Sequence, residues 1–192
     1  MKVGVLASGT GSNLQAILDR AHGREVEVVA VGSDKPGAPA LGRARAAGVA
    51  TASFPGSDYG SREARDGAMA AWLRERGAEL VVLAGYMQLV TPGFLAAFPR
   101  GVVNVHPALL PAFPGLGAIE QALAYGVKVF GVTVHVVDAG TDSGPVILQR
   151  ALELPGATDP EQVRDALRPL EHDLLTTAVT LIARGAVRPD PS

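Results

Sequence analysis

The chain has 192 residues, 47% of them hydrophobic and 19% charged, a balance typical of one globular domain rather than of a disordered chain. Its formal net charge of −2 argues against a general binder of nucleic acid or of anionic membranes. Because the chain contains no cysteine, disulfides, thiol catalysis and thiolate metal sites are excluded.

The chain starts with a short apolar run inside "MKVGVLASGTGSN". The run has only about five residues, which is too short for a signal peptide or a membrane span. The Gly-rich turn that follows is not typical of a cleavage region. We therefore expect a cytoplasmic protein with no membrane partner.

The first two thirds of the chain alternate between short apolar runs and amphipathic segments. The apolar runs predict buried strands at 2–7, 25–32, 79–85 and 101–106, with a shorter one at 48–53. The amphipathic segments predict helices at 13–21, 38–47, 61–76 and 117–125. Ser12 or Asn13 is the expected cap of the first helix, whereas Ser61 and Gly77 are expected to bound the third. This order predicts right-handed βαβ units in an open, mostly parallel, Rossmann-like sheet flanked by helices.

The last third of the chain has a different pattern. Residues 127–137 alternate like a strand with one polar face, and 144–154 form a second such segment. We expect these two to pair as an antiparallel hairpin joined by 138–144. A long amphipathic helix is predicted at 159–184, in which Pro169 should kink the axis or restart the helix. No linker interrupts the chain, so 1–192 is predicted to be a single α/β domain.

A Gly-rich loop, "ASGTGSNLQAIL" (7–18), joins the first strand to the first helix. Gly9 and Gly11 permit a tight turn, and the amides of Gly11, Ser12 and Asn13 would face outward at a helix N-terminus, which suits an anion. Leu14 stands where the dinucleotide fingerprint requires a third Gly, and no Gly-Lys-Ser/Thr follows, so neither a dinucleotide site nor an ATPase loop is predicted. A phosphate monoester on a small substrate and a plain capped turn both remain open.

Asn104 and His106 are two residues apart in the strand predicted at 101–106, so their side chains share one face. They lie at the C-terminal end of that strand, where open α/β sheets place ligands. An Asn amide can donate to an oxyanion, and a His can do so when protonated or can transfer a proton. The proline-rich loop that follows would hold this end rigid. A His that is satisfied in the core or stacked against proline is the alternative.

Asp142 and Asp138 are competing candidates for a carboxylate beside His106, although most loop Asp residues serve turns. A buried carboxylate there would raise the pKa of the imidazole and hold its orientation. Metal binding is not predicted, since the four His residues show no ligand spacing, and strand alternation puts His135 and Asp138 on opposite faces. A Ser nucleophile is not predicted either, because no G-x-S-x-G elbow is present.

The motifs follow one another in the order "ASGTGSNLQAI", "LAGYMQLV", "NVHPALLP", "FPGL", "GVTVHVV", "DSGPVILQ" and "RPLEHDLL". Over essentially the whole chain, this series resembles the phosphoribosylglycinamide formyltransferase family. The N-x-H-P…LLP element and the later Asp are shared by the wider group that uses formyltetrahydrofolate. The phosphate loop and the "EH" segment are what indicate this family.

The resemblance implies transfer of a formyl group from 10-formyltetrahydrofolate, a co-substrate, to the amine of phosphoribosyl glycinamide in purine biosynthesis. It implies small-molecule partners, no metal, no nucleic acid, and a monomer or homodimer. The N-terminal half would bind the phosphorylated substrate, and the C-terminal half would bind folate and carry out catalysis.

The resemblance also assigns residues. The catalytic set would be Asn104, His106 and Asp142. The phosphorylated substrate would be held by Gly11, Ser12, Asn13, Arg168, Pro169, Leu170 and Glu171. Folate would be bound by Arg62, Met87, Gln88, Leu89, Val90, Asn104, Asp138, Ala139, Gly140, Thr141 and Asp142.

The sequence departs from the family pattern at four positions. Many relatives carry Arg where Gln88 stands, and some carry Ser at Ala108 and His at Gly117 and Ile119. One charged contact to folate and any auxiliary polar role at the other three positions are therefore in question.

Three rival functions fit parts of this sequence. A formyltetrahydrofolate deformylase usually has an extra N-terminal domain, and it would have no use for a phosphate loop. Methionyl-tRNA formyltransferase needs a C-terminal RNA-binding domain, which is not expected here. A non-catalytic phosphate or nucleotide sensor would use the first loop but would not need Asn104, His106 and Asp142 together.

Overall fold

The computed structural model describes residues 1–98 and 100–189, and its framework is one seven-stranded sheet in the order β3-β2-β1-β4-β5-β6-β7. The strands are β1 (Lys2–Leu6), β2 (Glu27–Ser33), β3 (Ala50–Ser53), β4 (Leu80–Leu83), β5 (Val102–His106), β6 (Val129–Val136) and β7 (Val146–Glu153). Every strand expected from the sequence is present within a few residues of its predicted bounds.

The helices are α1 (Ser12–Arg20), α2 (Pro39–Ala46), α3 (Arg62–Glu75), α4 (Pro92–Ala96), α5 (Ala118–Tyr125) and α6 (Pro160–Ala183), with a 3₁₀ turn η1 (Gly56–Asp58). The sequence analysis did not predict α4 or η1. Both are too short to show a helical period. The start of α4 is nevertheless marked, because the Thr91 hydroxyl accepts a hydrogen bond from the Phe94 amide.

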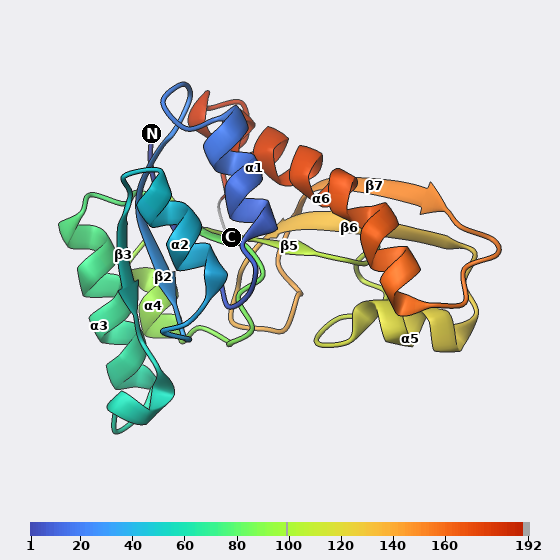
Figure 1. The fold of residues 1–192 in the computed structure, drawn as a ribbon, viewed down its shortest axis with the longest axis horizontal. Helices are drawn as coiled ribbons and strands as arrows, with labels where there is room; N and C mark the ends of the chain where they lie inside the picture. The colour runs from blue at the N-terminus through green and yellow to red at the C-terminus, as the bar shows by residue number, and fades with distance from the viewer. Residues whose placement is uncertain (99, 190–192) are drawn as a thin grey trace.

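Strand direction reverses twice across the sheet, on either side of β6. Strands β3, β2, β1, β4 and β5 are parallel, whereas β6 is antiparallel to both β5 and β7. The parallel part and the antiparallel hairpin are confirmed. Figure 1 shows β6 and β7 extending away from the parallel strands, with α6 lying across them.

The sheet is covered on both faces, as its apolar strands predict. Helices α1, α2, α5 and α6 pack into one hydrophobic core, and α3 and α4 pack into a second one (Figure 1). In β4 the alternation is direct, since Val82 belongs to the first core and Val81 to the second. All four residues of β4 are therefore buried.

The helix ends agree with the sequence analysis at α3 but not at α1. The Ser61 hydroxyl caps α3 by accepting from the Ala64 amide at 3.1 Å, and Gly77, with φ of 80°, follows its last turn. The prediction that Ser12 or Asn13 caps α1 is wrong. The cap residue is Gly11, with φ of 74° and no side-chain cap bond, because the Asn13 side chain is directed to another helix.

The long C-terminal helix is confirmed, and α6 continues through Pro169 without restarting. Across residues 1–98 and 100–189, none of the helices is both long enough and apolar enough to cross a membrane.

The order of the strands also sets the place of the site. From β1 the chain continues to β2, which pairs with one edge of β1, whereas β4 pairs with the other edge. The loops after β1 and β4 meet at this switch point, where the Ser8 amide donates to the Gly85 carbonyl at 3.0 Å. Ligand sites of open α/β sheets lie at such a point.

Candidate active site

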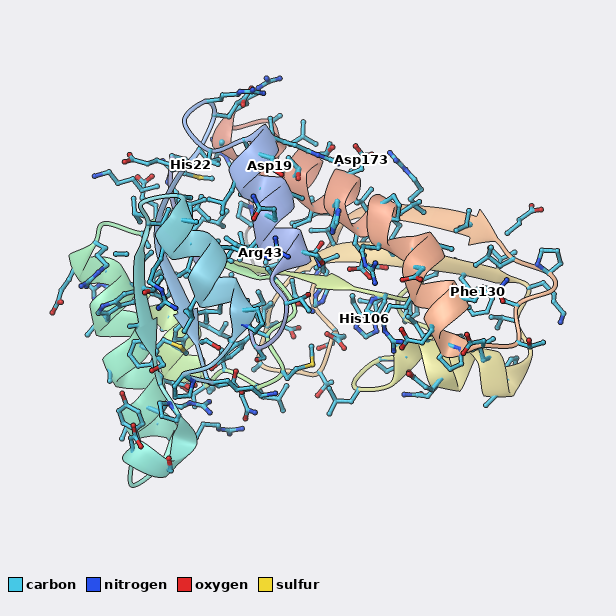
Figure 2. The ribbon with its side chains drawn as sticks, viewed as in Figure 1. Asp19, His22, Arg43, His106, Phe130 and Asp173 are labelled. Atoms are coloured by element: carbon cyan, nitrogen blue, oxygen red, sulfur yellow. The ribbon has the colours of Figure 1, made fainter. Side chains whose placement is uncertain are left out.

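Asn104 and His106 project from the C-terminal end of β5, as predicted. His106 is 5% exposed and Asn104 is half-buried. Neither side chain bonds to the other in the described part of the chain, since both face the carboxylate of Asp142 instead. In Figure 2 His106 lies in the middle of the molecule, between the first turn of α1 and helix α5 in that view.

Asp142 is where the candidate catalytic groups converge. Its Oδ2 lies 3.4 Å from His106 Nδ1 and accepts the Gly115 amide at 2.8 Å. Its Oδ1 lies 3.3 Å from His135 Nε2 and accepts from Asn104 Nδ2 at 3.4 Å. One carboxylate thus holds groups from three other segments of the chain.

The hydrogen-bond donors around Asp142 determine its charge. The hydrogen bond with His135, together with the Gly115 amide and the two nearby His rings, lowers the pKa of Asp142 from 3.8 to about 2, although burial acts in the opposite direction. Asp142 is therefore ionised at neutral pH and available as an acceptor.

Backbone conformation explains why Asp142, rather than Asp138, reaches the site. Asp142 has φ of 52°, in the left-handed region that Asp tolerates better than most residues. Asp138 stays within its own turn, where its Oδ1 accepts from the Gly140 amide at 3.0 Å and from the Ser143 hydroxyl at 2.8 Å. Of the two carboxylates left open by the sequence, Asp142 is the one that contacts His106.

The second ring nitrogen of His106 meets the loop after β5. His106 Nε2 lies 2.8 Å from the carbonyl oxygen of Phe113, whose φ of 54° is also left-handed. A carbonyl can only accept, so Nε2 carries a hydrogen, and Nδ1 faces an ionised carboxylate on the other side. The site thus offers an acceptor to each ring nitrogen, an arrangement that suits the charged imidazolium as a donor.

His135 was missed by the sequence analysis, which used it only to reject a metal site. It is 1% exposed, and its Nδ1 donates to the Val136 carbonyl at 2.9 Å. Its Nε2 faces Asp142 Oδ1 at 3.3 Å and Asn104 Nδ2 at 3.2 Å. The signal was present in "VTVHVV", where Thr133 and His135 are alternate polar residues in an apolar strand. The antiparallel register of β5 and β6 pairs Asn104 with His135 and so brings them together.

Thr133 supports the loop that carries His106. Its hydroxyl donates to the Ala108 carbonyl at 2.7 Å and accepts the Leu110 amide at 3.1 Å. Because Thr133 pairs with His106 in the β5–β6 register, one strand anchors both His106 and the loop that follows it.

The Gly-rich loop and the start of α1 have a side-chain partner far away in the sequence. Asn13 Nδ2 donates to Glu171 Oε2 at 3.0 Å, across 158 residues, and Asn13 Oδ1 is buried without a partner among the described residues. Burial raises the pKa of Glu171, although the Asn13 bond and nearby cations act against it. Glu171 therefore faces the start of α1.

The other predicted substrate residues on α6 are arranged differently. Arg168 is exposed and pairs with Asp165 at 2.8 Å, while Pro169 and Leu170 belong to the same helical turn. No hydrogen bond or ion pair joins these three to the loop of α1 in the described structure. Arg168 still acts on Glu171 through its charge, since it lowers the pKa of that carboxyl.

The predicted folate residues fall in separate segments. Met87 and Leu89 expose 54% and 59% of their surface beside β4, whereas Val90 is half-buried. The Met87 amide donates to Ser8 at 2.9 Å, and Gln88 donates to Asp34 at 3.3 Å. The 138–142 segment, with Ala139, Gly140 and Thr141, forms the loop before β7.

Arg62 is the exposed first residue of α3, and no hydrogen bond or ion pair links it to the cluster around Asp142 in the described part of the chain. The structure thus brings Asn104, His106 and Asp142 into contact but leaves the Arg62 prediction without a contact to support it.

The three other departures from the family pattern have structural explanations. Gly117 precedes α5 with φ of 70°, a conformation that favours glycine. Ile119 is 3% exposed and belongs to the hydrophobic core, and Ala108 is buried with its carbonyl bonded to Thr133. None of these side chains can supply a polar group to the site. Within residues 1–98 and 100–189, no three His, Asp or Glu side chains form a group that could hold a metal.

Comparison with known families gives one match over most of the chain. A family model described as "Formyl transferase" matches residues 1–179. Among curated proteins, the phosphoribosylglycinamide formyltransferase of Mycobacterium tuberculosis (strain ATCC 25618 / H37Rv) is 44% identical over 190 residues, covering 95% of this chain and 85% of that protein. The protein of the same name from Bacillus subtilis (strain 168) is 40% identical over 173 residues, covering 89% of each chain.

Solved structures agree with these relatives. Glycinamide ribonucleotide transformylase 1 from Symbiobacterium toebii superposes with a TM-score of 0.93 at 48% identity, covering 96% of this chain and 88% of that one. Phosphoribosylglycinamide formyltransferase from Bacillus halodurans superposes with a TM-score of 0.91 at 39% identity and covers 97% of both chains.

Proposed function

Because this chain belongs to the formyl transferase family, we propose that it transfers the formyl group of 10-formyltetrahydrofolate to the amine of N1-(5-phospho-D-ribosyl)glycinamide. The product is the N2-formyl compound, and the reaction is a step of de novo purine biosynthesis. The relatives that match nearly the whole chain carry the name of this activity.

The observation that carries the proposal is the convergence of Asn104, His106 and His135 on the ionised carboxylate of Asp142. A formyl transfer needs donors for a developing oxyanion and a base that can accept a proton, close together in one site. A sensor for phosphate would need neither.

In the proposed reaction, the neutral amine attacks the formyl carbon and gives a tetrahedral oxyanion. Asn104 and the charged form of His106 donate hydrogen bonds to it. The bond from the formyl carbon to the folate nitrogen then breaks, and Asp142 helps the proton of the attacking amine pass, through water, to that nitrogen. One such donor typically lowers the barrier by about 3–4 kcal/mol.

The geometry adds a condition to this mechanism. Asn104 Nδ2 and His106 Nδ1 each face Asp142 at 3.4 Å, and Asn104 Nδ2 also faces His135 at 3.2 Å. For these donors to reach the oxyanion, it must replace one present partner of each, and the contacts with Asp142 are the longest of them. Contacts of 3.4 Å are long for hydrogen bonds, so exchanging them costs little.

We place the substrate phosphate at the amides of Gly11, Ser12 and Asn13, where α1 begins without a side-chain cap. Glu171, bonded to Asn13, accepts a hydrogen bond from the glycinamide or ribose part. Arg168, Pro169 and Leu170 shape the same end of the pocket.

Folate is proposed to bind between the segment Met87–Val90 and the loop Asp138–Asp142, with Arg62 at its outer edge. The exposure of Met87 and Leu89 supports this, since exposed apolar side chains beside a site offer a surface for an aromatic ligand. Gln88 replaces a cation that many relatives have, so its contact with folate is neutral.

Other features of the protein remain predictions. The chain would act as a single domain, with its N-terminal half binding the phosphorylated substrate and its C-terminal half binding folate and carrying out catalysis. It would work in the cytoplasm, on small molecules, without a metal, as a monomer or a homodimer.

A two-arm assay tests the proposal. The protein is incubated with 10-formyltetrahydrofolate, with and without phosphoribosyl glycinamide, and both folate and acceptor are followed. Turnover only when both substrates are present supports the transferase. Loss of the formyl group without the acceptor would indicate a deformylase, and no turnover in either arm would indicate a sensor.

A further inference from the structure

Arg43 on α2 lies against the phosphate loop, although no step of the proposed mechanism uses it. Its Nε donates to the Thr10 carbonyl at 2.7 Å, and its Nη1 donates to Gln15 Oε1 at 3.2 Å. Thr10 precedes α1 and Gln15 belongs to its first turns, so the guanidinium spans the start of the helix. Figure 2 shows Arg43 beside this end of α1.

Helix α2 is packed closely on the loop at this point. The Ala40 amide donates to the Gly9 carbonyl at 3.2 Å, and a Cβ built on Gly11 would lie 2.7 Å from the Ala40 Cβ and 3.4 Å from Arg43 Cδ. Gly11 is thus required both by its φ of 74° and by this contact. The loop can hold its shape only with α2 behind it.

The charge of Arg43 is not neutralised by a carboxylate. Its two bonded partners are a carbonyl and a side-chain amide, and no ion pair of Arg43 is present among the described residues. By contrast, Arg150, Arg164 and Arg184 each pair with Asp or Glu. A free positive charge at a helix N-terminus adds to the potential that attracts an anion.

The bond to Thr10 also acts directly on a proposed phosphate donor. The carbonyl of Thr10 and the amide of Gly11 belong to one peptide unit. A cation that hydrogen-bonds to the oxygen polarises the unit and makes its N–H a stronger donor. Arg43 therefore strengthens the Gly11 amide while standing behind it.

A second observation indicates that a ligand belongs in this place. Asn13 is 7% exposed, yet its Oδ1 has no partner among the described residues. A buried acceptor without a donor is costly, and a ligand that carries a hydroxyl beside its phosphate would satisfy it.

We infer that Arg43 is a positioning residue for the phosphate loop and makes the protein selective for a phosphorylated acceptor. This inference rests on the proposed function, because it takes the phosphate at the start of α1 as given. Arg43 acts by bonding to the loop, which fixes the loop's shape, and by its positive charge, which attracts the phosphate.

The test compares Arg43→Gln and Arg43→Lys with Arg45→Gln as the matched control. Arg45 lies on the same helix and also has no ion pair in the described structure, but its Nη1 is directed to Thr51 on β3, at 3.4 Å. We expect Arg43→Gln to raise KM for phosphoribosyl glycinamide about fivefold to tenfold, as a charge several ångströms from the phosphate would. Arg43→Lys should recover part of this loss, and Arg45→Gln should cause none.

Three readouts separate this role from a merely structural one. With Arg43→Gln, kcat, KM for folate and the melting temperature should match those of Arg45→Gln. KM for the acceptor without its phosphate should not change. Added salt should weaken the binding of phosphoribosyl glycinamide less in Arg43→Gln than in the wild type. An equal rise in KM for both acceptors, or the same rise in Arg45→Gln, would overturn the inference.

Binding of ribose 5-phosphate, measured by calorimetry, keeps the inference separate from the proposed reaction. If the wild type transfers no formyl group, the proposed function fails, yet a loss of ribose 5-phosphate affinity in Arg43→Gln still supports the role of Arg43. Absence of ribose 5-phosphate binding by the wild type, or equal binding by both proteins, overturns it.

Discussion

Asp142, at the proposed catalytic end of the site, and Glu171, at the proposed substrate end, are both partly removed from water, but their pKa values move in opposite directions. Four groups surround Asp142, and its pKa falls to about 2. Glu171 has one side-chain donor, Asn13, and burial raises its pKa. Burial alone favours the neutral carboxyl, and only a sufficient number of donors reverses that effect.

The comparison has a functional meaning. A carboxylate held ionised by its neighbours can orient donors and accept a proton, whereas a carboxyl with one donor is left free to bond a substrate. Four experiments test this contrast between Asp142 and Glu171.

The largest effect is expected for Asp142→Asn. Asn tolerates the left-handed φ of position 142, so the loop should keep its shape. The negative charge that holds His106 is lost, and kcat should fall by about two to three orders of magnitude. Steady-state kinetics measure the fall, and calorimetry should show nearly unchanged binding of the phosphorylated substrate.

Asp138→Asn is the control for this experiment, because Asn can make the same turn bonds. It should retain most of kcat, and, because Asp138 lies in the proposed folate loop, any effect should fall on KM for folate. Near-wild-type turnover in Asp142→Asn would remove Asp142 from the mechanism and, with it, the contrast.

A smaller effect is expected for Glu171→Gln. Gln can still accept from Asn13, but the charged acceptor for the substrate is lost. KM for the acceptor should rise roughly tenfold, with kcat changed much less, as for one hydrogen bond to a charged group. Asp173→Asn, on the same helix and exposed beside Arg150, is the control and should leave KM unchanged. A fall in kcat equal to that of Asp142→Asn would contradict the separation of roles.

His135→Leu tests which neighbour sets the charge of Asp142. It removes the hydrogen bond that contributes most to the low pKa, so the pKa of Asp142 should rise toward its usual value. The carboxyl carbon of Asp142, followed by NMR titration, measures this directly. kcat should fall by roughly tenfold. His135→Gln keeps a donor of similar reach and should stay closer to the wild type, and an unmoved titration in His135→Leu would exclude His135 as the main cause.

The smallest effect concerns stability in acid. The folded-state pKa of Asp142, about 2, is below its ordinary 3.8, so the ionised carboxylate stabilises the fold above about pH 4 and this stabilisation is lost as the pH falls toward 2. The difference in unfolding free energy between wild type and Asp142→Asn should shrink by about 1–2 kcal/mol over that range. Urea unfolding at several pH values measures it.

Glu171 should show the opposite sign. Because its pKa is raised, its contribution is present at low pH and is lost as the pH rises through the folded-state value. The wild type should therefore lose stability relative to Glu171→Gln as the pH increases. If stability changed with pH in the same direction for both carboxylates, the contrast between Asp142 and Glu171 would be wrong.

Much of the fold could be predicted from the sequence, because its signals are local. The apolar runs predicted five strands and the alternating segments predicted the other two, while the helical periods predicted five of the six α-helices, all but α4. Asn104 and His106 were placed on one face because strand geometry repeats every two residues. The Gly-rich loop before α1 was predicted from glycines next to a predicted helix start, although its capping residue was not.

Tertiary structure decided the rest. Asp142 was separated from Asp138 by a left-handed backbone conformation, and His135 entered the site through the register of β5 against β6. Glu171 met Asn13 across 158 residues, and Arg43 reached the loop from a helix whose pattern gave no sign of it. Local periodicity reports which face of a strand or helix a residue occupies, but not which distant face packs against it. That pairing depends on register and on packing of the whole sheet, and these groups become a site only when the chain has folded.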